Sequence, residues 1–308
     1  MHAFYTDHFV LPLPEGHRFP MQKYRLLRET IKDHPQITLL EAPAASDTQL
    51  LYAHNAGYIQ KVLAGELSES EQRAIGFPWS ERMVERSRRS AGATIAACLS
   101  ALKQGVAVNL AGGTHHAYRD HGSGFCVFND AAIAARMLQK MQGASFRVAI
   151  IDLDVHQGNG TAAILKNDAH TFTLSLHGEH NFPFKKEESN LDIALPNGCS
   201  DAVYLDALQG ALRDVKTTFN PQFIIYLAGA DPHEQDRLGK LSLTKAGMLA
   251  RDQLVYDFAK LHGLPVAIAM AGGYGKVIEE TVAIHAQTIE AALCLDQSLN
   301  QSLNQSAR

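Results

Sequence analysis

The strongest constraint on the fold is the alternation of short apolar runs with helix-like segments from residue 106 onward. Each run is long enough for one strand, and the segments between them repeat apolar residues at helical spacing. This alternation predicts a parallel sheet with helices on both faces. No linker interrupts the units, so we expect a single α/β domain. The predicted strands are Val106–Leu110, Arg147–Ile151, Thr171–Leu176, Phe223–Ala228 and Val266–Met270.

Further elements are expected outside this region. Apolar runs predict an edge strand at Ala3–Tyr5 and short strands at Ile37–Leu40 and Asp192–Leu195. Residues 296–308 are polar, repeat Q-S-L-N, and predict a disordered tail after a domain of residues 1–295. The main helices expected outside the strand-rich region are Met21–Asp33, Asn55–Leu63, Glu81–Gln104 and Tyr274–Leu295.

Composition excludes several classes of protein. Hydrophobic residues make up 46% of the chain and the net charge is −4, so we expect a large core and no nucleic-acid or membrane partner. The four cysteines form no C-x-x-C pair, which favours free thiols in a reducing compartment. The N-terminus has no signal-peptide pattern, and no run approaches the ~20 apolar residues of a membrane span. These features predict a soluble cytoplasmic protein.

The strand Arg147–Ile151 leads into D-L-D-V-H-Q-G-N-G, which carries metal-binding residue types. Asp152, Asp154 and His156 are spaced at i, i+2 and i+4, so an extended chain would point them to one side. Asp231 follows the strand Phe223–Ala228, and parallel strands end at one edge. Asp154, His156 and Asp231 are therefore candidate ligands of a catalytic Zn²⁺ with an open position for water. The same donors also suit Fe²⁺ or Mn²⁺.

Acid–base groups follow two other strands. His115 and His116 lie in a glycine-flanked loop, and a histidine can exchange a proton near neutral pH. Asp152 and Asn159 are candidate partners that orient these rings. Tyr274 follows two glycines and could hydrogen-bond a carbonyl oxygen that becomes an oxyanion. Taken singly, surface histidines and an ordinary tyrosine at a helix start remain the simpler interpretations.

The motifs G-G-T-H-H-A, G-F-C-V-F-N-D, D-L-D-V-H-Q-G-N-G-T, G-A-D and G-G-Y occur in this order. Together they resemble the zinc-dependent histone deacetylase family of the arginase–deacetylase superfamily, over about residues 7–289. The Q-G-N-G form and the short length look most like class IV and bacterial deacetylase-like proteins. The resemblance implies the arginase–deacetylase fold and a zinc-dependent amidohydrolase that removes acyl groups from Nε-acyl-lysine.

The resemblance also implies a role for each matching residue. It makes Asp154, His156 and Asp231 the zinc ligands, His116 the general base and acid, and His115 an electrostatic aid paired with Asp152. It makes Tyr274 the residue that polarises the acyl carbonyl. It further implies a structural K⁺ held by Asp152, Ser175 and Leu176 with the carbonyls of Asp154 and His156, and a substrate tunnel walled by Gly124, Phe125 and Phe182 with Leu238 at its rim. Asn159 departs from the class I pattern, which has an aspartate there, so a neutral amide would orient His116.

Alternatives remain at this stage. Deacetylation of acetylpolyamines or other small acylated amines uses the same centre, and a module that binds acyl-lysine without turnover would keep the same tunnel. A binuclear manganese ureohydrolase is disfavoured, because Gly158 stands where that chemistry needs another aspartate. The sequence leaves open the acyl length, the choice between protein and small-molecule substrate, and the oligomeric state.

Overall fold

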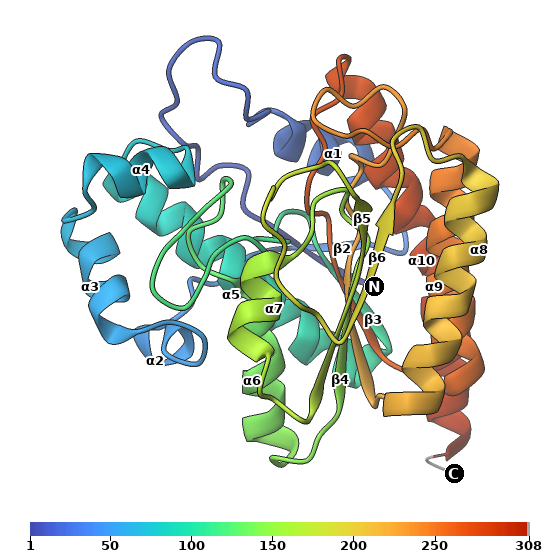
Figure 1. The fold of residues 1–308 in the computed structure, drawn as a ribbon. Coiled ribbons are helices and arrows are strands. Elements are labelled where there is room, and N and C mark those ends of the chain that lie inside the picture. Colours follow the sequence, from blue (N-terminus) through green and yellow to red (C-terminus); the bar gives the residue numbers. More distant parts are fainter. Residues whose placement is uncertain (307–308) are drawn as a thin grey trace.

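A computed structural model shows one sheet of eight parallel strands (Figure 1). It describes residues 1–306, with residues 297–306 described only as helical backbone. The spatial order of the strands is β2-β1-β3-β8-β7-β4-β5-β6. Their bounds are β1 His2–Tyr5, β2 Thr38–Glu41, β3 Val106–Asn109, β4 Val148–Asp152, β5 Thr171–Gly178, β6 Leu191–Leu195, β7 Phe223–Leu227 and β8 Val266–Ala269.

Helices cover both faces of this sheet, as the alternation predicts (Figure 1). One face carries α5 (Glu81–Gln104), α6 (Asp130–Gln142) and α7 (Asn159–Leu165), with α2 (Asp47–Leu50), α3 (Ala56–Ala64) and α4 (Glu69–Ile75) outside them. The other face carries α1 (Lys23–Ile31), α8 (Asp201–Asp214) with a π-helical turn at Val215–Phe219, α9 (Lys245–His262) and α10 (Ile278–Ser306).

The strands bury side chains on both sides, so they read as continuous apolar runs. In β4, Ile150 packs into the core beneath α5 and α6, and its neighbour Ile151 packs into the core beneath α8 and α9. Every residue of β3, β4, β5, β7 and β8 is buried. This double burial explains why these five strands were predictable from short apolar runs alone.

Near the N-terminus, one prediction is wrong and one helix was missed. The strand expected at the edge, β1, lies inside the sheet, because it pairs with both β2 and β3. Helix α4 was not predicted, since its seven residues are mostly polar and carry no long apolar period. Its start is nevertheless encoded locally: Ser68 and Glu71 form a capping box that satisfies free backbone N–H groups.

The last helix also differs from the prediction at both ends. Tyr274 lies in the loop before α10, which begins at Ile278 and continues to Ser306. The segment expected to be a disordered tail is therefore helical through Ser306; residues 307–308 lie outside the described residues. No proline or glycine follows Leu295 to stop the helix. The division into a domain of residues 1–295 and a tail stays a prediction.

Helix α5 approaches the segment after β2 so closely that one position excludes any side chain. A Cβ on Gly92 would collide with the carbonyl oxygen of Pro43 and come within 2.9 Å of the Ala45 nitrogen. The backbone of this segment is fixed to α5, because the Ala45 N–H donates to the carbonyl oxygen of Arg88. The close packing thus depends on glycine at position 92.

We expect Gly92→Ala to lower the free energy of unfolding by about 1–3 kcal/mol, because the added methyl must push backbone away. Gly57→Ala is the matched control: it adds the same methyl within helix α3, where nothing lies within 4 Å. It should be neutral or stabilising by up to about 1 kcal/mol. Chemical denaturation of both variants measures the difference, and equal midpoints would contradict the packing argument.

Candidate active site

Four neighbouring strands of the sheet end in the residues that the sequence singles out. β3, β8, β7 and β4 are consecutive in the spatial order, and all run in the same direction. The chain therefore delivers His115 and His116 after β3, Tyr274 after β8, Asp231 after β7, and the segment 152–156 at the end of β4, to one edge. Ligands bind at this carboxyl edge in open parallel sheets.

Asp154, His156 and Asp231 form a compact, buried cluster of potential metal ligands. One ligand atom from each lies within 4.8 Å of the others. Nδ1 of His156 lies 2.9 Å from Oδ1 of Asp154 and 3.3 Å from Oδ2 of Asp231. Oδ2 of Asp231 is buried without a hydrogen-bond partner.

Burial and the neighbouring Asp154 carboxylate raise the pKa of Asp231 to about 7. A divalent cation fits this donor set, because it would neutralise the paired carboxylates and use the unpartnered oxygen.

The local backbone that presents these ligands is a bend and not an extended strand. β4 ends at Asp152, so strand alternation does not bring Asp152, Asp154 and His156 together. The bend is fixed by carboxylates that accept backbone N–H groups: Asp152 Oδ1 accepts from Asp154 at 3.2 Å, and Asp154 Oδ1 accepts from His156 at 2.9 Å. Asp152 then faces His115 and lies outside the ligand cluster.

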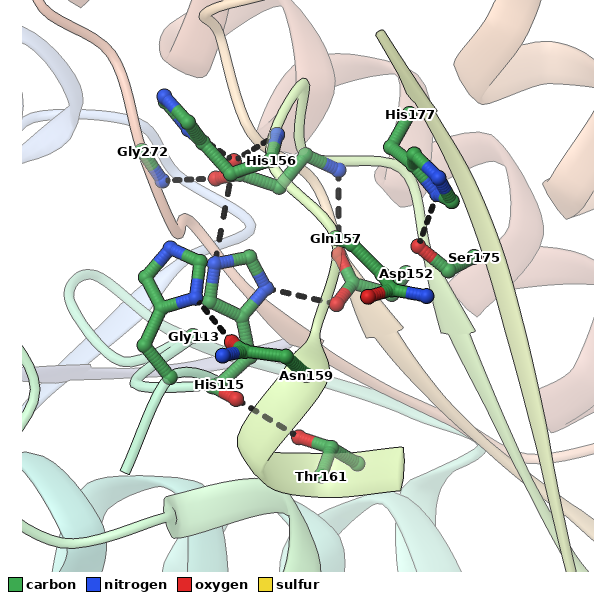
Figure 2. Close-up of polar contacts among 12 residues, drawn as sticks. Gly113, His115, Asp152, His156, Gln157, Asn159, Thr161, Ser175, His177 and Gly272 are labelled. Atoms are coloured by element: carbon green, nitrogen blue, oxygen red, sulfur yellow. Dashed lines mark hydrogen bonds and ion pairs between the residues drawn. The ribbon is translucent and has the colours of Figure 1, made fainter. Parts of the chain in front are cut away.

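Contacts from other strands hold the two carboxylates in place. Asp231 Oδ1 accepts the N–H of Val155 at 2.9 Å. Asp154 Oδ2 accepts the N–H of Gly272 at 2.8 Å (Figure 2). A side chain on Gly272 would collide with Asp231 and crowd Asp154. The G-G-Y glycine is thus needed for space beside the ligands.

Beneath the site, the fully buried Arg251 on α9 supports the ligand segments. Its Nη1 donates to the carbonyl oxygens of Gly229 at 2.6 Å and Leu153 at 3.4 Å, which precede the ligands Asp231 and Asp154 in the chain. Asp252 neutralises this guanidinium through contacts of 2.7 Å and 3.0 Å. The sequence analysis did not single out this pair, because a helix with adjacent Arg and Asp usually exposes both.

The adjacent histidines have different partners. Nδ1 of His115 lies 2.7 Å from Oδ2 of Asp152, and Nδ1 of His116 lies 2.6 Å from Oδ1 of Asn159 (Figure 2). Burial alone would lower the pKa of His115, but Asp152 and Asp154 outweigh it and raise the pKa to about 9. Burial, with positive charge on His115 and His156, holds the pKa of His116 well below its usual value. Near neutral pH, His115 is therefore charged and His116 is neutral.

Asn159 belongs to a longer chain of hydrogen bonds. Its Nδ2 donates to the hydroxyl of Tyr118 at 3.0 Å, and that hydroxyl donates to Oε1 of Glu187 at 3.2 Å. This arrangement turns the amide oxygen toward His116, so the proton of the neutral ring sits on Nδ1 and Nε2 keeps its lone pair. Sequence reasoning missed Tyr118 and Glu187, which are 69 residues apart.

Tyr274 lies at the same edge, in the loop before α10. Its backbone N–H donates to Oδ2 of Asp236 at 2.6 Å, and its carbonyl oxygen accepts from Arg237 at 2.9 Å. Its ring centre is 6.4 Å from that of His156. Burial and the charges of Asp154 and Asp231 raise the pKa of its phenol, so the hydroxyl keeps its proton.

The predicted tunnel residues line an outer cavity that also reaches His116, His156 and Tyr274. Phe182 packs edge-on to His116, with ring centres 4.9 Å apart. Gly124 has φ of 52°, and a Cβ there would lie 2.6 Å from Cδ2 of His116. All four residues predicted for the tunnel, Gly124, Phe125, Phe182 and Leu238, line this cavity.

The predicted potassium ligands lie together on the neighbouring strands β4 and β5. Asp152 is the register partner of Ser175, and Leu176 follows in β5; all three are buried. Oγ of Ser175 lies 3.0 Å from Nδ1 of His177 (Figure 2). The geometry brings these residues together, and the ion itself stays a prediction.

Comparison with known proteins identifies the family. The histone deacetylase domain model matches residues 17–289. An uncharacterised protein of Picosynechococcus is 42% identical, covering 94% of this chain and 97% of its own. The histone deacetylase-like amidohydrolase of Pseudomonas aeruginosa is 33% identical, covering 78% and 67%. A crystal structure of a histone deacetylase homologue from Aquifex aeolicus has a TM-score of 0.81 and 26% identity, covering 97% and 84%.

The chain therefore belongs to the histone deacetylase family, and its fold is that of the family's solved structures. Relatives named as deacetylases support a hydrolase of this kind. A solved structure of a histone deacetylase homologue that is 26% identical to this chain contains bound SAHA. Across residues 1–306, no helix combines the length and apolar character needed to cross a membrane.

We expect Asn159→Asp to raise the pKa of His116, because a carboxylate favours the protonated ring that a neutral amide does not. The sequence analysis expects His116 to act as a general base, and only a neutral ring can accept a proton. The rising limb of kcat/KM against pH should then move to higher pH. Tyr118→Phe separates charge from orientation: it removes a hydrogen bond that orients the amide but adds no carboxylate, so it should not raise the pKa of His116. If the aspartate variant keeps the wild-type profile, Asn159 does not set the basicity of His116.

Proposed function

We propose that this protein is a zinc-dependent deacylase that hydrolyses the amide of Nε-acyl-lysine. The observation that carries the proposal is the buried cluster of Asp154, His156 and Asp231, with its unpartnered carboxylate oxygen, at the inner end of the outer cavity. Two histidines with opposite pKa shifts and a protonated tyrosine line the same site. Such separated pKa values are typical of acid–base catalysis.

Each residue of the site has a separate role in the proposed hydrolysis. A bound divalent ion would polarise the acyl carbonyl and lower the pKa of a water molecule. Nε2 of His116 accepts a proton from the attacking water and then returns it to the leaving amine. The Tyr274 hydroxyl donates a hydrogen bond to the carbonyl oxygen as that oxygen gains negative charge. His115 stays protonated between Asp152 and Asp154, and supplies positive charge beside the reacting centre.

The outer cavity favours acyl-lysine over an acetylated polyamine. The charged side chains that line this cavity outside the candidate metal site are all basic: Arg18, Arg73 and Lys240. No aspartate or glutamate lines it. Arg73 forms an ion pair with Glu69 at the surface, whereas Arg18 forms no ion pair with a carboxylate in the described part of the chain. A polyamine would bring further positive charges to this rim, while an acylated lysine side chain is neutral.

We expect Tyr274→Phe to lower kcat about 10²–10³-fold with zinc content unchanged, because the hydroxyl acts on the oxyanion and is not a ligand. Asp231→Ala should instead lose zinc, measured by metal analysis, and chelation should abolish activity that added zinc restores. Tyr52→Phe, which removes a hydroxyl far from the site, is the control. A folded, zinc-loaded wild type that binds an acetyl-lysine peptide without hydrolysis would favour the binding-module alternative.

We also expect kcat/KM for an acetyl-lysine peptide to exceed that for acetylspermidine at least several-fold at low salt. Like charges at the rim repel the polyamine, and screening weakens this effect as ionic strength rises. The variant Arg18→Gln should reduce the difference in kcat/KM between the acetyl-lysine peptide and acetylspermidine. A preference for the polyamine that is independent of salt would instead support the small-amine alternative.

A further inference from the structure

A second, inner cavity adjoins the candidate metal site, because Asp154 and His156 are among its lining residues. It shares His116, His156, Gly124, Phe125 and Tyr274 with the outer cavity. A substrate whose lysine stem occupies the outer cavity would therefore direct its acyl chain toward the inner one. The lining away from the metal site includes Leu11, Phe19, Tyr24, Phe77 and Arg86.

Arg86 is an unusual member of this lining. The side chain comes from helix α5 and the residue is only 6% exposed. Its guanidinium lies 4.5 Å from the ring centre of Tyr24 and 5.9 Å from that of Phe19. Nε and Nη2 are buried without any hydrogen-bond partner, and no carboxylate in the described part of the chain forms an ion pair with Arg86. Burying an unpaired guanidinium costs free energy of folding. We therefore expect an anionic ligand to pair with Arg86.

A second buried cation stands beside the same aromatic ring. Nζ of Lys23 lies 5.3 Å from the ring centre of Tyr24 and 5.6 Å from that of Tyr274. It donates to the carbonyl oxygens of Ala271 at 3.0 Å and Gly273 at 3.4 Å, and has no carboxylate partner among the described residues. Arg86 lines the inner cavity, and Lys23 adds positive charge next to two rings that line it, those of Tyr24 and Tyr274. Apart from the candidate metal ligand Asp154, the lining contains no carboxylate.

We propose that Arg86 makes the inner cavity a carboxylate-binding subsite, and that the acyl groups selected there end in a carboxylate, as succinyl and glutaryl groups do. This inference rests on the proposed deacylase function. A carboxylate in the cavity would supply the counter-charge that the Arg86 guanidinium lacks. A neutral chain of the same length would leave this buried charge unpaired. The reaction is otherwise unchanged: water cleaves the amide C–N bond, giving the free amine and a dicarboxylate.

The test compares kcat/KM for succinyl-lysine and butyryl-lysine peptides of one sequence, using the zinc-loaded protein. We expect the wild type to prefer the succinyl peptide, and Arg86→Met to lower the succinyl-to-butyryl ratio about 10–100-fold, the size of a lost charged hydrogen bond. Arg86→Lys keeps a charge and should retain part of the preference. Arg82→Met, an exposed position one turn earlier on α5, is the matched control and should leave the ratio unchanged.

Calorimetry gives a readout that does not depend on turnover. Succinate should bind the zinc-loaded wild type more tightly than butyrate does, and Arg86→Met should remove this difference. A folded Arg86→Met, verified by its unfolding midpoint, with an unchanged substrate ratio would overturn the inference and leave the deacylase proposal intact. If acetate binding depends on Arg86 but succinyl peptides are not preferred, then Arg86 binds the carboxylate product and does not select the acyl group of the substrate. That result would also overturn the inference.

The two proposals can fail separately. If no acyl peptide is hydrolysed by protein shown to hold zinc, the deacylase function fails. Succinate binding that is lost in Arg86→Met would then still support the carboxylate subsite but not its role in acyl selection. Equal binding of succinate by wild type and Arg86→Met would reject the subsite as well.

Discussion

The arrangement of this site depends on two carboxylates, Asp154 and Asp231, that are buried beside each other. Two like charges in the interior repel, and the pKa of Asp231 rises to about 7 as a consequence. The surrounding structure accommodates this cost: backbone N–H groups of Val155 and Gly272 donate to the carboxylates. One oxygen remains without a partner. A bound cation would resolve the remaining repulsion, which is why the donor set is better explained by metal binding than by stability.

The parallel sheet makes this juxtaposition feasible. Ligands come from loops after β4 and β7, which are adjacent strands, so two short loops suffice to bring the carboxylates together. From below, Arg251 holds the carbonyl groups that precede both ligands, and Asp252 keeps that arginine neutralised. The precision of the site thus rests on buried polar contacts within the scaffold, since loops alone are mobile.

Electrostatic differences between neighbouring groups give the two histidines separate tasks. His115 has a carboxylate partner and stays charged, whereas His116 has an amide partner and stays neutral. The hydroxyl of Tyr118 and the carboxylate of Glu187 fix the orientation of that amide. The amide of Asn159 therefore holds the His116 ring by the same kind of contact that a carboxylate would make, but it does not raise the pKa of the ring as a carboxylate would.

The sequence by itself determined the parallel α/β class, the five central strands and the polar residues at their ends. These depend on local patterns: buried strands need apolar runs, and close backbone approach needs glycine, as at Gly272. The helical end of the chain was not predicted, because the helix propensity of this polar segment is weak. The interior position of β1 was not predicted, because it depends on pairing with strands that are distant in the sequence. Only the tertiary structure brought Lys23 to carbonyls 248 and 250 residues away, and placed Arg86 in the inner cavity. Both residues sit on helices in which a cation is normally solvated, so burial without a counter-charge could be found only from the packed chain.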